Sequence, residues 1–449
     1  MRAVILAAGQ GYRIRLLSKG KPKCLIRLLG LTILERILYA CRGAGVREFL
    51  IILGFEGERI RRFLGDGSRL GVKIFYIPCP DWEKGNGVSL HAAKRYIRRG
   101  EKFLVLMSDH LIQPELLQRF VEEAAACPRS LMSYDEKLGE LPNMKEATKV
   151  RIGSRGDILG VGKGLRRYGG VDCGVFAFTP LIFKCLEEAF AINRFTLSDG
   201  LNFLIRRRAI RGFHIGNFYW QDIDSRLDLS IARYKILSRL NTGKEGWVSR
   251  VINRRFSNQI TRRLINYNIT PNMVSISSFL VAIVSAILFI LKMPFYAGLI
   301  AQFSSILDGV DGELARAKFL VSPFGGYMDS ILDRYADLFL IFGMSSYVYS
   351  RQPTGTVLLI SFLALMGAPM SMLCKERFYS AFGLPFIPDQ MDGWTRHLPA
   401  NRDGRLFIIM VSGILNQVLY GLLALGIITN FQTLYRLFSV KRMKLKTTD

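Results

Sequence analysis

Paired cysteines and a secretory leader are both missing from the sequence. The 7 cysteines among 449 residues are scattered and include no CxxC pair. Because disulfide frameworks and zinc sites depend on regularly spaced cysteines, neither is predicted, and we expect reduced thiols. The apolar run after Met1 and Arg2 is short and passes directly into a glycine loop, so no signal peptide is predicted. We therefore expect the N-terminal part of the chain to be cytoplasmic.

Acidic residues are scarce relative to basic ones. The chain has 62 Lys and Arg against 36 Asp and Glu, which gives a formal net charge of +26. Such a surplus favours a polyanionic partner: nucleic acid, anionic lipid or phosphorylated substrates. Between Arg233 and Arg263, Lys and Arg predominate and Glu245 is the one acid. Because this run directly precedes a long apolar segment, as cytosolic flanks of membrane helices do, we expect a lipid bilayer as partner and no nucleic acid.

Long uncharged apolar runs are absent from residues 1–232. Here short strand-like runs alternate with helical patterns, which favours a parallel sheet with right-handed crossovers. Strands are predicted at residues 3–7, 49–53, 72–77 and 103–107, with a further βα region that includes 170–178 and 213–219. Helices are predicted at residues 33–42, 60–64 and 88–97. We predict a cytosolic α/β domain of the Rossmann-like type, with a mostly parallel sheet, over residues 1–232.

Residues 273–449 contain the long apolar segments that the first part lacks. The segment 273–291 carries no charge, and a helix of this length crosses about 30 Å of hydrocarbon. Shorter or interrupted segments follow at 294–307, 324–348, 354–373, 406–415 and 418–438. We predict an all-α membrane domain of six transmembrane helices, preceded by a basic juxtamembrane linker with an amphipathic helix over 233–272. An even number of spans puts both ends on the cytoplasmic side of the cell membrane, which agrees with the basic tail Lys441, Arg442, Lys444 and Lys446.

A glycine-containing loop directly follows the first predicted strand. It reads Leu6, Ala7, Ala8, Gly9, Gln10, Gly11, Tyr12 and Arg13, and the segment Lys21-Pro22-Lys23 ends ten residues after Arg13. Glycines at the end of a strand allow backbone N–H groups to approach a triphosphate, while Arg13 and Lys23 can neutralise its charge. The whole string resembles the signature of the sugar-phosphate nucleotidyltransferases. It departs from that signature at Tyr12, where Thr or Ser is usual, and at Leu16, where Pro is frequent.

This resemblance implies a nucleotide-binding set and a metal site. Leu6, Ala7, Ala8, Gly9, Gly11 and Lys23 would bind the nucleotide, with base-reading contacts from Gly85, Asn86 and Ser89, and Lys23 and Arg13 would be catalytic. Asp109 and Asp224 would hold Mg²⁺, with Mn²⁺ as the alternative ion. Asp109 as a simple cap, and Asp222 in place of Asp224, stay open as alternatives. His110 is expected to form local hydrogen bonds. The acceptor phosphate is expected to meet basic side chains among Lys149, Lys163, Arg166 and Arg167, although a solvated basic face would look the same.

Four aspartates near the predicted membrane surface form the second pattern. Asp308 and Asp311 are three residues apart, and Asp329 and Asp333 are four apart. Each pair therefore shares one face of a helix, so that four carboxylates can converge. Ionised carboxylates near a membrane are costly unless they meet a cation or water. The spacing predicts a divalent metal cluster; acids that merely end helices in the headgroup zone are the alternative.

The full pattern, DxxDGxxAR and then GxxxDxxxD, is similar to the signature of the CDP-alcohol phosphatidyltransferase family at every defined position. The resemblance implies that Asp308, Asp311 and Asp329 are metal ligands and that Asp333 is both a ligand and the general base. It further implies that the CDP nucleotide lies against Asp311, Gly312, Ala315, Arg316 and Gly325. Arg402 and Arg405 are expected to grip the acceptor's phosphate, although a plain basic flank would look the same. Asp337 is expected to have no catalytic role.

The fusion of the two patterns narrows the chemistry. A CDP-consuming second domain selects CTP as the nucleotide of the first. The pair resembles a family of bifunctional enzymes that convert CTP and inositol 1-phosphate to CDP-inositol, and then join CDP-inositol to a second inositol 1-phosphate. This implies CTP, inositol phosphate and CDP-inositol as ligands, a compatible solute as product, and a homodimer. A phospholipid synthase with a lipid alcohol as acceptor is the alternative within enzymes; a membrane scaffold with two decayed sites is the alternative outside them.

Overall fold

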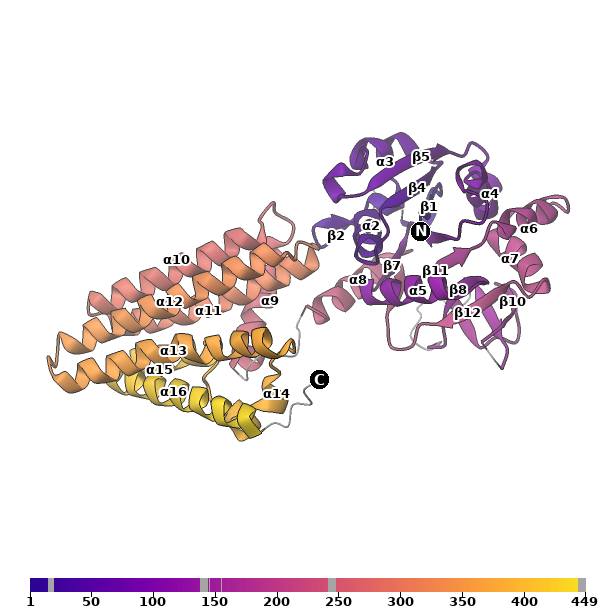
Figure 1. Ribbon diagram of the computed structural model, residues 1–449. Coiled ribbons are helices and arrows are strands. Elements are labelled where there is room, and N and C mark those ends of the chain that lie inside the picture. Colours follow the sequence, from indigo (N-terminus) through magenta and orange to yellow (C-terminus); the bar gives the residue numbers. More distant parts are fainter. Residues whose placement is uncertain (15–19, 138–143, 145, 155, 241–247, 443–449) are drawn as a thin grey trace. The chain divides into compact units, whose positions relative to one another are not determined.

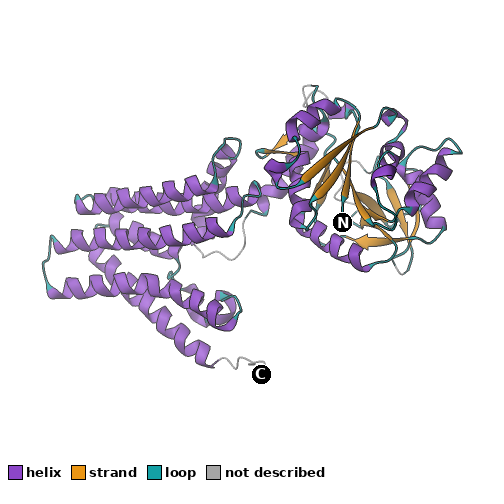
Figure 2. Ribbon diagram, turned by 45° about the horizontal axis from the view of Figure 1, so that its top comes forward, coloured by secondary structure: helices purple, strands orange, loops and turns teal. Residues whose placement is uncertain are grey.

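The computed structural model describes residues 1–14, 20–137, 144, 146–154, 156–240 and 248–442. Leu16, Glu245 and residues 443–449 lie outside this described part, and so do the side chains of Arg13, Lys441 and Arg442. The chain divides into two compact units, Met1–Ile236 and Leu237–Asp449. Figure 2 shows the sheet of the first unit and the long helices of the second. Each unit is described by itself.

A nine-stranded mixed sheet forms the centre of the first unit. One part is parallel and contains β6 (Phe103–Met107), β1 (Ala3–Ala7), β4 (Glu48–Leu53) and β5 (Lys73–Pro78). The other part is built around the long strand β11 (Gly170–Phe178), which runs antiparallel to β6, β8 (Ser130–Asp135) and β9 (Lys149–Ile152). β10 (Ile158–Gly162) pairs antiparallel with β9, and β12 (Ile210–His214) pairs parallel with β8.

The predicted mostly parallel sheet is therefore wrong for the later strands. A parallel pair needs a crossover of a dozen or more residues, usually a helix, whereas short connections return the chain antiparallel. β9, β10 and β11 follow one another through such short connections. In the predicted βα region, residues 213–219 contain the end of β12, and a separate strand, β13 (Trp220–Asp222), follows them and pairs with β7 (His110–Ile112).

Helices cover this sheet, as Figure 1 shows. They are α2 (Ile33–Gly43), α3 (Gly57–Leu64), α4 (Asn86–His91), α5 (Pro114–Ala126), α6 (Leu181–Phe190), α7 (Leu197–Arg206) and α8 (Arg226–Ser238). A short hairpin of β2 (Arg27–Leu28) and β3 (Leu31–Thr32) precedes α2, and Thr32 caps that helix in a capping box with Glu35. The predicted helix at 88–97 is shorter in the structure, because α4 ends at His91 and a 3₁₀ turn, η5 (Lys94–Tyr96), follows it.

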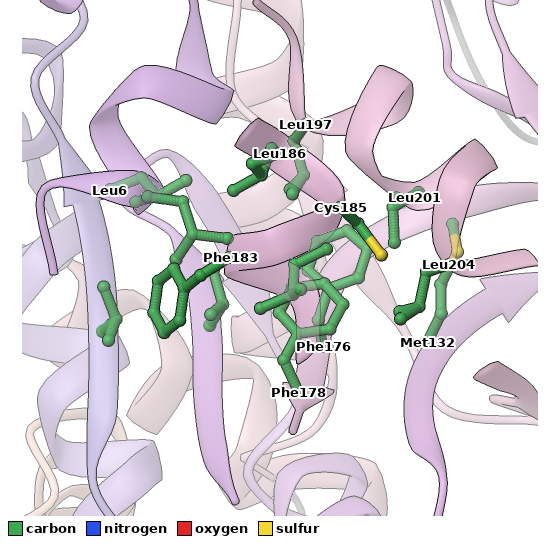
Figure 3. Packing of buried hydrophobic residues seen from close by; sticks show 14 of the residues in the cluster. Leu6, Met132, Phe176, Phe178, Phe183, Cys185, Leu186, Leu197, Leu201 and Leu204 are labelled. Atoms are coloured by element: carbon green, nitrogen blue, oxygen red, sulfur yellow. The ribbon is translucent and has the colours of Figure 1, made fainter. Parts of the chain in front are cut away.

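One hydrophobic core of the first unit lies between the sheet and helices α6 and α7. Figure 3 shows Phe176 and Phe178 of β11 facing side chains of both helices. The ring of Phe103 on β6 stacks on that of Phe183 on α6, with centroids 5.4 Å apart. Burying aromatic and aliphatic side chains of this size contributes about 1.5–3 kcal/mol each. The core therefore holds the carboxyl ends of β1 and β6 rigid, and both ends carry predicted site residues.

The described part of the second unit is helical. After a short π-helical turn, η7 (Ser249–Asn253), and α9 (Arg254–Leu264) come α10 (Pro271–Ile290), α11 (Pro294–Ala317), α12 (Pro323–Tyr349) and α13 (Gly355–Phe382). Two short elements, α14 (Pro388–Met391) and η8 (Gly393–His397), precede α15 (Arg402–Ile414) and α16 (Val418–Arg442). α11 continues ten residues beyond the predicted end at Leu307, so that the aspartate pattern lies within helices.

Three helices of the second unit are long and apolar enough to cross a membrane among the residues searched. They are Pro271–Ile290, Gly355–Phe382 and Val418–Val440. α11 and α12 have the length, but each carries several ionisable side chains. α15 has 13 residues, which at about 1.5 Å per residue is shorter than the hydrocarbon layer. The coarse prediction of a helical membrane part is confirmed, while the count of six spans stays a prediction.

Glycines bring the helices of this unit close together. A Cβ on Gly413 of α15 would lie 3.0 Å from the Cα of Gly298 on α11 and 2.5 Å from Pro294 O. A Cβ on Gly343 of α12 would lie 2.6 Å from Ala286 O on α10. Small residues at such crossings allow backbones to approach, as is common for helices in membranes. These crossings fix α11 and α12, which carry the four aspartates, against α15 and α10.

Candidate active sites

The predicted nucleotide loop borders a cavity at the carboxyl end of β1. The cavity has a volume of about 270 Å³ and is lined by Leu6, Ala7, Ala8, Gly9, Gly11, Lys23, Asn86, Ser89, Asp109 and Asp224, among others. Gly11 has φ +62°, and a Cβ there would lie 2.8 Å from the Cβ of Lys23. Glycine at this position therefore lets the loop curl against Lys23. The predicted nucleotide and metal residues of the first site thus share one cavity, with Gly85 and Arg13 as exceptions treated next.

Gly85 has a packing role that the sequence did not reveal. A Cβ at this position would lie 2.6 Å from the carbonyl oxygen of Phe195, and its φ is +151°. The neighbouring Asn86 accepts a hydrogen bond from the backbone N–H of Leu197 at 2.8 Å. Both contacts attach the start of α4 to the start of α7. The prediction for Arg13 concerns a side chain outside the described part of the structure.

Lys23 lies among three carboxylates. Its Nζ is 2.7 Å from Asp109 Oδ2, 2.5 Å from Asp224 Oδ1 and 3.5 Å from Asp222 Oδ1. Burial alone would lower the pKa of Lys23, but the three carboxylates raise it above its ordinary value. Burial likewise opposes ionisation of Asp109, yet the charges of Lys23 and His110 lower the pKa of Asp109 to about 2. The site therefore holds a charged amine beside the ionised carboxylate of Asp109.

Pairing of β7 with β13 adds His110 and Asp222 to this group. The two residues are opposite each other in the strand register. His110 Nδ1 donates to the carbonyl of Cys173 at 2.9 Å, and Nε2 lies 3.8 Å from both Asp109 and Asp222. One ligand atom from each of these three side chains lies within 4.8 Å of the others. The sequence predicts only a local role for His110 and favours Asp224 over Asp222 as the metal ligand. The pairing of β7 with β13, which brings His110 and Asp222 together, cannot be predicted from the local sequence.

A second, larger cavity adjoins the nucleotide cavity. It has a volume of about 610 Å³ and shares Asn86, Met107, Asp109 and Asp224 with the first. Thr148, Lys163 and Asp172 also line it, which gives it hydroxyl, ammonium and carboxyl groups. Asp172 accepts a hydrogen bond from Gly174 N at 2.8 Å, and burial raises the pKa of Asp172 to about 6. A polyol phosphate is the kind of molecule that such a lining suits.

Lys149, predicted to hold the acceptor phosphate, is engaged elsewhere. Its Nζ lies 5.0 Å from the ring centroid of Tyr168, a cation–π contact. Lys163, on the turn after β10, lines the larger cavity instead. No sequence pattern separates these two lysines, because one begins a short strand and the other follows one within the same basic stretch.

The second site lies between α11 and α12. Asp308 and Asp311 on α11 and Asp329 on α12 each offer an oxygen within 4.8 Å of the others. Ser275 of α10 donates a hydrogen bond to Asp311 Oδ2. Asp333, one turn after Asp329, lies 2.8 Å from Arg402 Nη1 of α15. Arg402 also forms an ion pair with Asp308, so the four predicted aspartates and Arg402 form one cluster.

The other residues of the second pattern surround this cluster. A Cβ on Gly312 would lie 3.1 Å from Arg316 Nη1, so the guanidinium folds back over the glycine. A Cβ on Gly325 would lie 3.3 Å from Asn272 Oδ1, at the start of α10, where Thr270 caps the helix by accepting from Met273 N. Ala315 is half-buried on α11.

Arg405 differs from Arg402. It is only 2% exposed, donates to Ala400 O at 2.7 Å and forms an ion pair with Asp337 of α12. α12 and α15 are thus joined by two ion pairs, Asp333 with Arg402 and Asp337 with Arg405. Arg402 lies at the carboxylate cluster, whereas Arg405 is buried between α12 and α15. The phosphate contact of Arg405 stays a prediction. The burial of its partner, Asp337, favours a structural role for Arg405.

Both clusters of acidic side chains suit a divalent cation. Carboxylate oxygens are the ligands that Mg²⁺ and Mn²⁺ prefer, and histidine can join them. One candidate set consists of Asp109, His110 and Asp222. Asp224 lies near this set, because it forms an ion pair with the same Lys23 that contacts Asp109. Asp308, Asp311 and Asp329 form the other. The first unit has a mixed sheet with a glycine loop beside carboxylates, and the second is a helical unit that bears four aspartates. Together these features define a nucleotidyltransferase joined to a CDP-alcohol phosphotransferase.

Comparison with known families agrees with this class. Residues 3–152 match the family described as MobA-like NTP transferase domain, and residues 268–395 match CDP-alcohol phosphatidyltransferase. Whole-length relatives carry the name bifunctional IPC transferase and DIPP synthase. The one from Aquifex aeolicus is 32% identical and covers 98% of each chain; the one from Rubrobacter xylanophilus is 34% identical and covers 98% of this chain and 96% of its own.

The chain belongs to the family of bifunctional IPC transferases and DIPP synthases, and it is a transferase with two catalytic units. Among solved structures, the inositol-1-phosphate CTP transferase from T. maritima is 25% identical over 54% of this chain and 96% of that chain, with a TM-score of 0.47.

Proposed function

We propose that the protein catalyses two successive displacements at phosphorus. In the first unit, a phosphate oxygen of inositol 1-phosphate attacks the α-phosphorus of CTP, which gives CDP-inositol and pyrophosphate. In the second unit, a hydroxyl of another inositol 1-phosphate attacks the β-phosphorus of CDP-inositol, which gives di-inositol phosphate phosphate and CMP. The observation that carries this proposal is the presence of two complete carboxylate clusters in a chain whose relatives, similar over their whole length, are named for two transferase activities.

In the first reaction, backbone N–H groups of the loop from Leu6 to Gly11 would hold the triphosphate of CTP. Lys23 and Arg13 would carry the positive charge that meets the phosphates. Asp109, with Asp224 or Asp222, would hold a divalent ion. Such an ion neutralises charge on the phosphates during transfer. Lys163 and Asp172 line the adjoining cavity and would orient the phosphate and hydroxyls of the acceptor, so that positioning supplies much of the rate.

In the second reaction, Asp333 would accept the proton of the attacking inositol hydroxyl. Asp308, Asp311 and Asp329 would hold the divalent ion against the diphosphate, and Arg402 would leave its ion pair with Asp333 to meet the acceptor's phosphate. The bond from the hydroxyl oxygen to the β-phosphorus forms while the bond to the CMP oxygen breaks, and Asp333 keeps the proton. General base catalysis of this kind contributes about 10²–10⁴-fold.

The cellular setting is part of the proposal. Six spans, with α11, α12 and α15 crossing the bilayer beside the three strongly apolar helices, would place both carboxylate clusters on the cytoplasmic side of the cell membrane. The basic segment 233–272 would then lie at the inner surface, where the positive-inside rule expects it. Residues 1–232 would form the cytosolic domain and 273–449 the membrane domain. A homodimer through the membrane part and Mg²⁺ as the resident ion complete the proposal.

Membranes that contain the protein, incubated with CTP, radiolabelled inositol 1-phosphate and Mg²⁺, test the proposal. We expect pyrophosphate release, a transient labelled CDP-inositol and a water-soluble di-inositol product. Labelled product that partitions into organic solvent would instead support a phospholipid synthase with a lipid alcohol as acceptor. Absence of CTP-dependent pyrophosphate release would contradict the first reaction and favour a scaffold.

A further inference from the structure

The segment predicted as a juxtamembrane linker carries a row of buried polar side chains. Ser249, Asn253, Ser257 and Thr261 follow one another at intervals of four residues on η7 and α9, and each is at most 6% exposed. Side chains four apart share one face of a helix. A segment that only connected two units would leave these polar groups in water, so this face of α9 is a packing surface. Its partner is α11, beside α9 in Figure 1.

The face of α9 binds one buried carboxylate of α11. Glu313 is fully buried, and its carboxylate accepts hydrogen bonds from Ser257 Oγ at 2.7 Å and from Thr261 Oγ1 at 2.5 Å. Arg254 Nη1 lies 2.6 Å from the same carboxylate. A buried charge is costly unless it is paired and hydrogen-bonded. Three donors from a single helix therefore fix Glu313, and with it one side of α11, against α9.

Asn253, at the end of η7 and directly before α9, extends the same row of polar side chains to α15 through an amide network. Asn253 Nδ2 donates to Ser305 Oγ at 2.9 Å and lies 3.4 Å from Asp403 Oδ1. Gln302 Nε2 donates to Asn253 Oδ1 at 2.6 Å. Asp403 directly follows Arg402, which is part of the aspartate cluster. η7 and α9 thus contact residues close in sequence to site residues, Glu313 near Asp311 on α11 and Asp403 next to Arg402 on α15.

We propose that Glu313 is a positioning residue for the phosphotransferase site and that it acts through α9; this inference rests on the proposed function of the second unit. Glu313 comes two residues after Asp311, and successive helical residues turn by about 100°, so the two side chains leave α11 on nearly opposite sides. Ser275 holds Asp311 from the α10 side, and α9 holds Glu313 from the other. Together they fix the rotation of α11 about its axis, which decides whether Asp308 and Asp311 face Asp329.

The test uses Glu313→Gln in the full chain, with its own first reaction as internal reference. Residues that orient metal ligands typically change metal affinity or activity by about 10–100-fold when they are removed. We expect the Mg²⁺ concentration for half-maximal transfer from CDP-inositol to rise by about 10–100-fold, while CTP-dependent pyrophosphate release keeps its Mg²⁺ dependence. Mn²⁺ binding followed by electron paramagnetic resonance, in an Asp109→Asn, Asp224→Asn background, should weaken at the second site by a similar factor.

A conservative pair makes the test independent of gross folding. Thr261→Ser keeps the hydroxyl that donates to Glu313, whereas Thr261→Val keeps the shape and removes the donor. We expect Thr261→Ser to retain the wild-type Mg²⁺ dependence and Thr261→Val to shift it in the direction of Glu313→Gln. If Glu313→Gln fails to fold, the comparison of Thr261→Ser with Thr261→Val still tests the positioning role of Glu313.

Asp392→Asn is the matched control for a lost buried charge. Asp392 is 1% exposed and pairs with Arg436 of α16, away from α11. We expect this variant to melt at a lower temperature with an unchanged Mg²⁺ midpoint. If Glu313→Gln and Thr261→Val behave like Asp392→Asn, Glu313 is merely structural and the inference is overturned. If the wild-type protein transfers nothing from CDP-inositol, the proposed function fails instead.

Discussion

Arg402 on α15 lies 2.8 Å from Asp333 on α12, so that the proposed general base of the second reaction is held by a cation. The same guanidinium forms an ion pair with Asp308. An acceptor that brings its own phosphate would compete for Arg402 and release Asp333 near the attacking hydroxyl. The arrangement therefore links binding of a phosphorylated acceptor to the availability of the base.

Asp333→Asn should abolish the second reaction and spare the first. An asparagine keeps the size of the side chain but cannot take a proton, so transfer from CDP-inositol should fall by about 10²–10⁴-fold. Pyrophosphate release from CTP should stay at the wild-type rate, and CDP-inositol should accumulate. Both are measured on one preparation by ion-exchange chromatography. A variant that still forms the di-inositol product at the wild-type rate would exclude Asp333 as the base.

The inner ion pair, Asp337 with Arg405, should matter for stability more than for chemistry. Both side chains are almost fully buried, at 5% and 2% exposure. Removing one partner leaves the other charge buried and unpaired, which costs about 3–5 kcal/mol of stability. Asp337→Asn should therefore lower the melting temperature strongly, whereas the double change Asp337→Leu, Arg405→Leu should recover much of the loss. A double variant that is stable but has lost its affinity for inositol 1-phosphate would instead support a phosphate contact by Arg405.

The glycine loop of the first site offers a matched pair of substitutions. Gly11→Ala forces a non-glycine residue to φ +62° and places a Cβ 2.8 Å from Lys23 Cβ, and the left-handed backbone alone costs about 1–2 kcal/mol. A Cβ on Gly9 would meet nothing within 4 Å. We expect Gly11→Ala to raise the KM for CTP and to lower the melting temperature of the first unit. Gly9→Ala should leave the melting temperature unchanged, which calorimetry can check.

Much of this arrangement follows from local sequence, but its long-range parts do not. The strand at 3–7 and the paired aspartates 308/311 and 329/333 were predicted because apolar runs and three- or four-residue spacings act within one element. Asp222 joins His110 only through the pairing of β13 with β7, across 112 residues of chain. Arg402 reaches the aspartates because Gly298 and Gly413 let α11 and α15 approach. Contacts of this kind depend on packing between elements, which no local pattern encodes.

The two lysines near the acceptor cavity provide the last prediction. Lys163 lines the 610 Å³ cavity next to the carboxylates, whereas Lys149 lies against the ring of Tyr168. A hydrogen bond to a charged group contributes about 1.5–3 kcal/mol, which corresponds to roughly 10–100-fold in affinity. Lys163→Met should therefore raise the KM for inositol 1-phosphate in the first reaction by about that factor and leave the KM for CTP unchanged, while Lys149→Met should alter neither. Initial rates of pyrophosphate release at varied inositol 1-phosphate measure both variants, and the opposite ranking would assign the phosphate contact to Lys149 instead of Lys163.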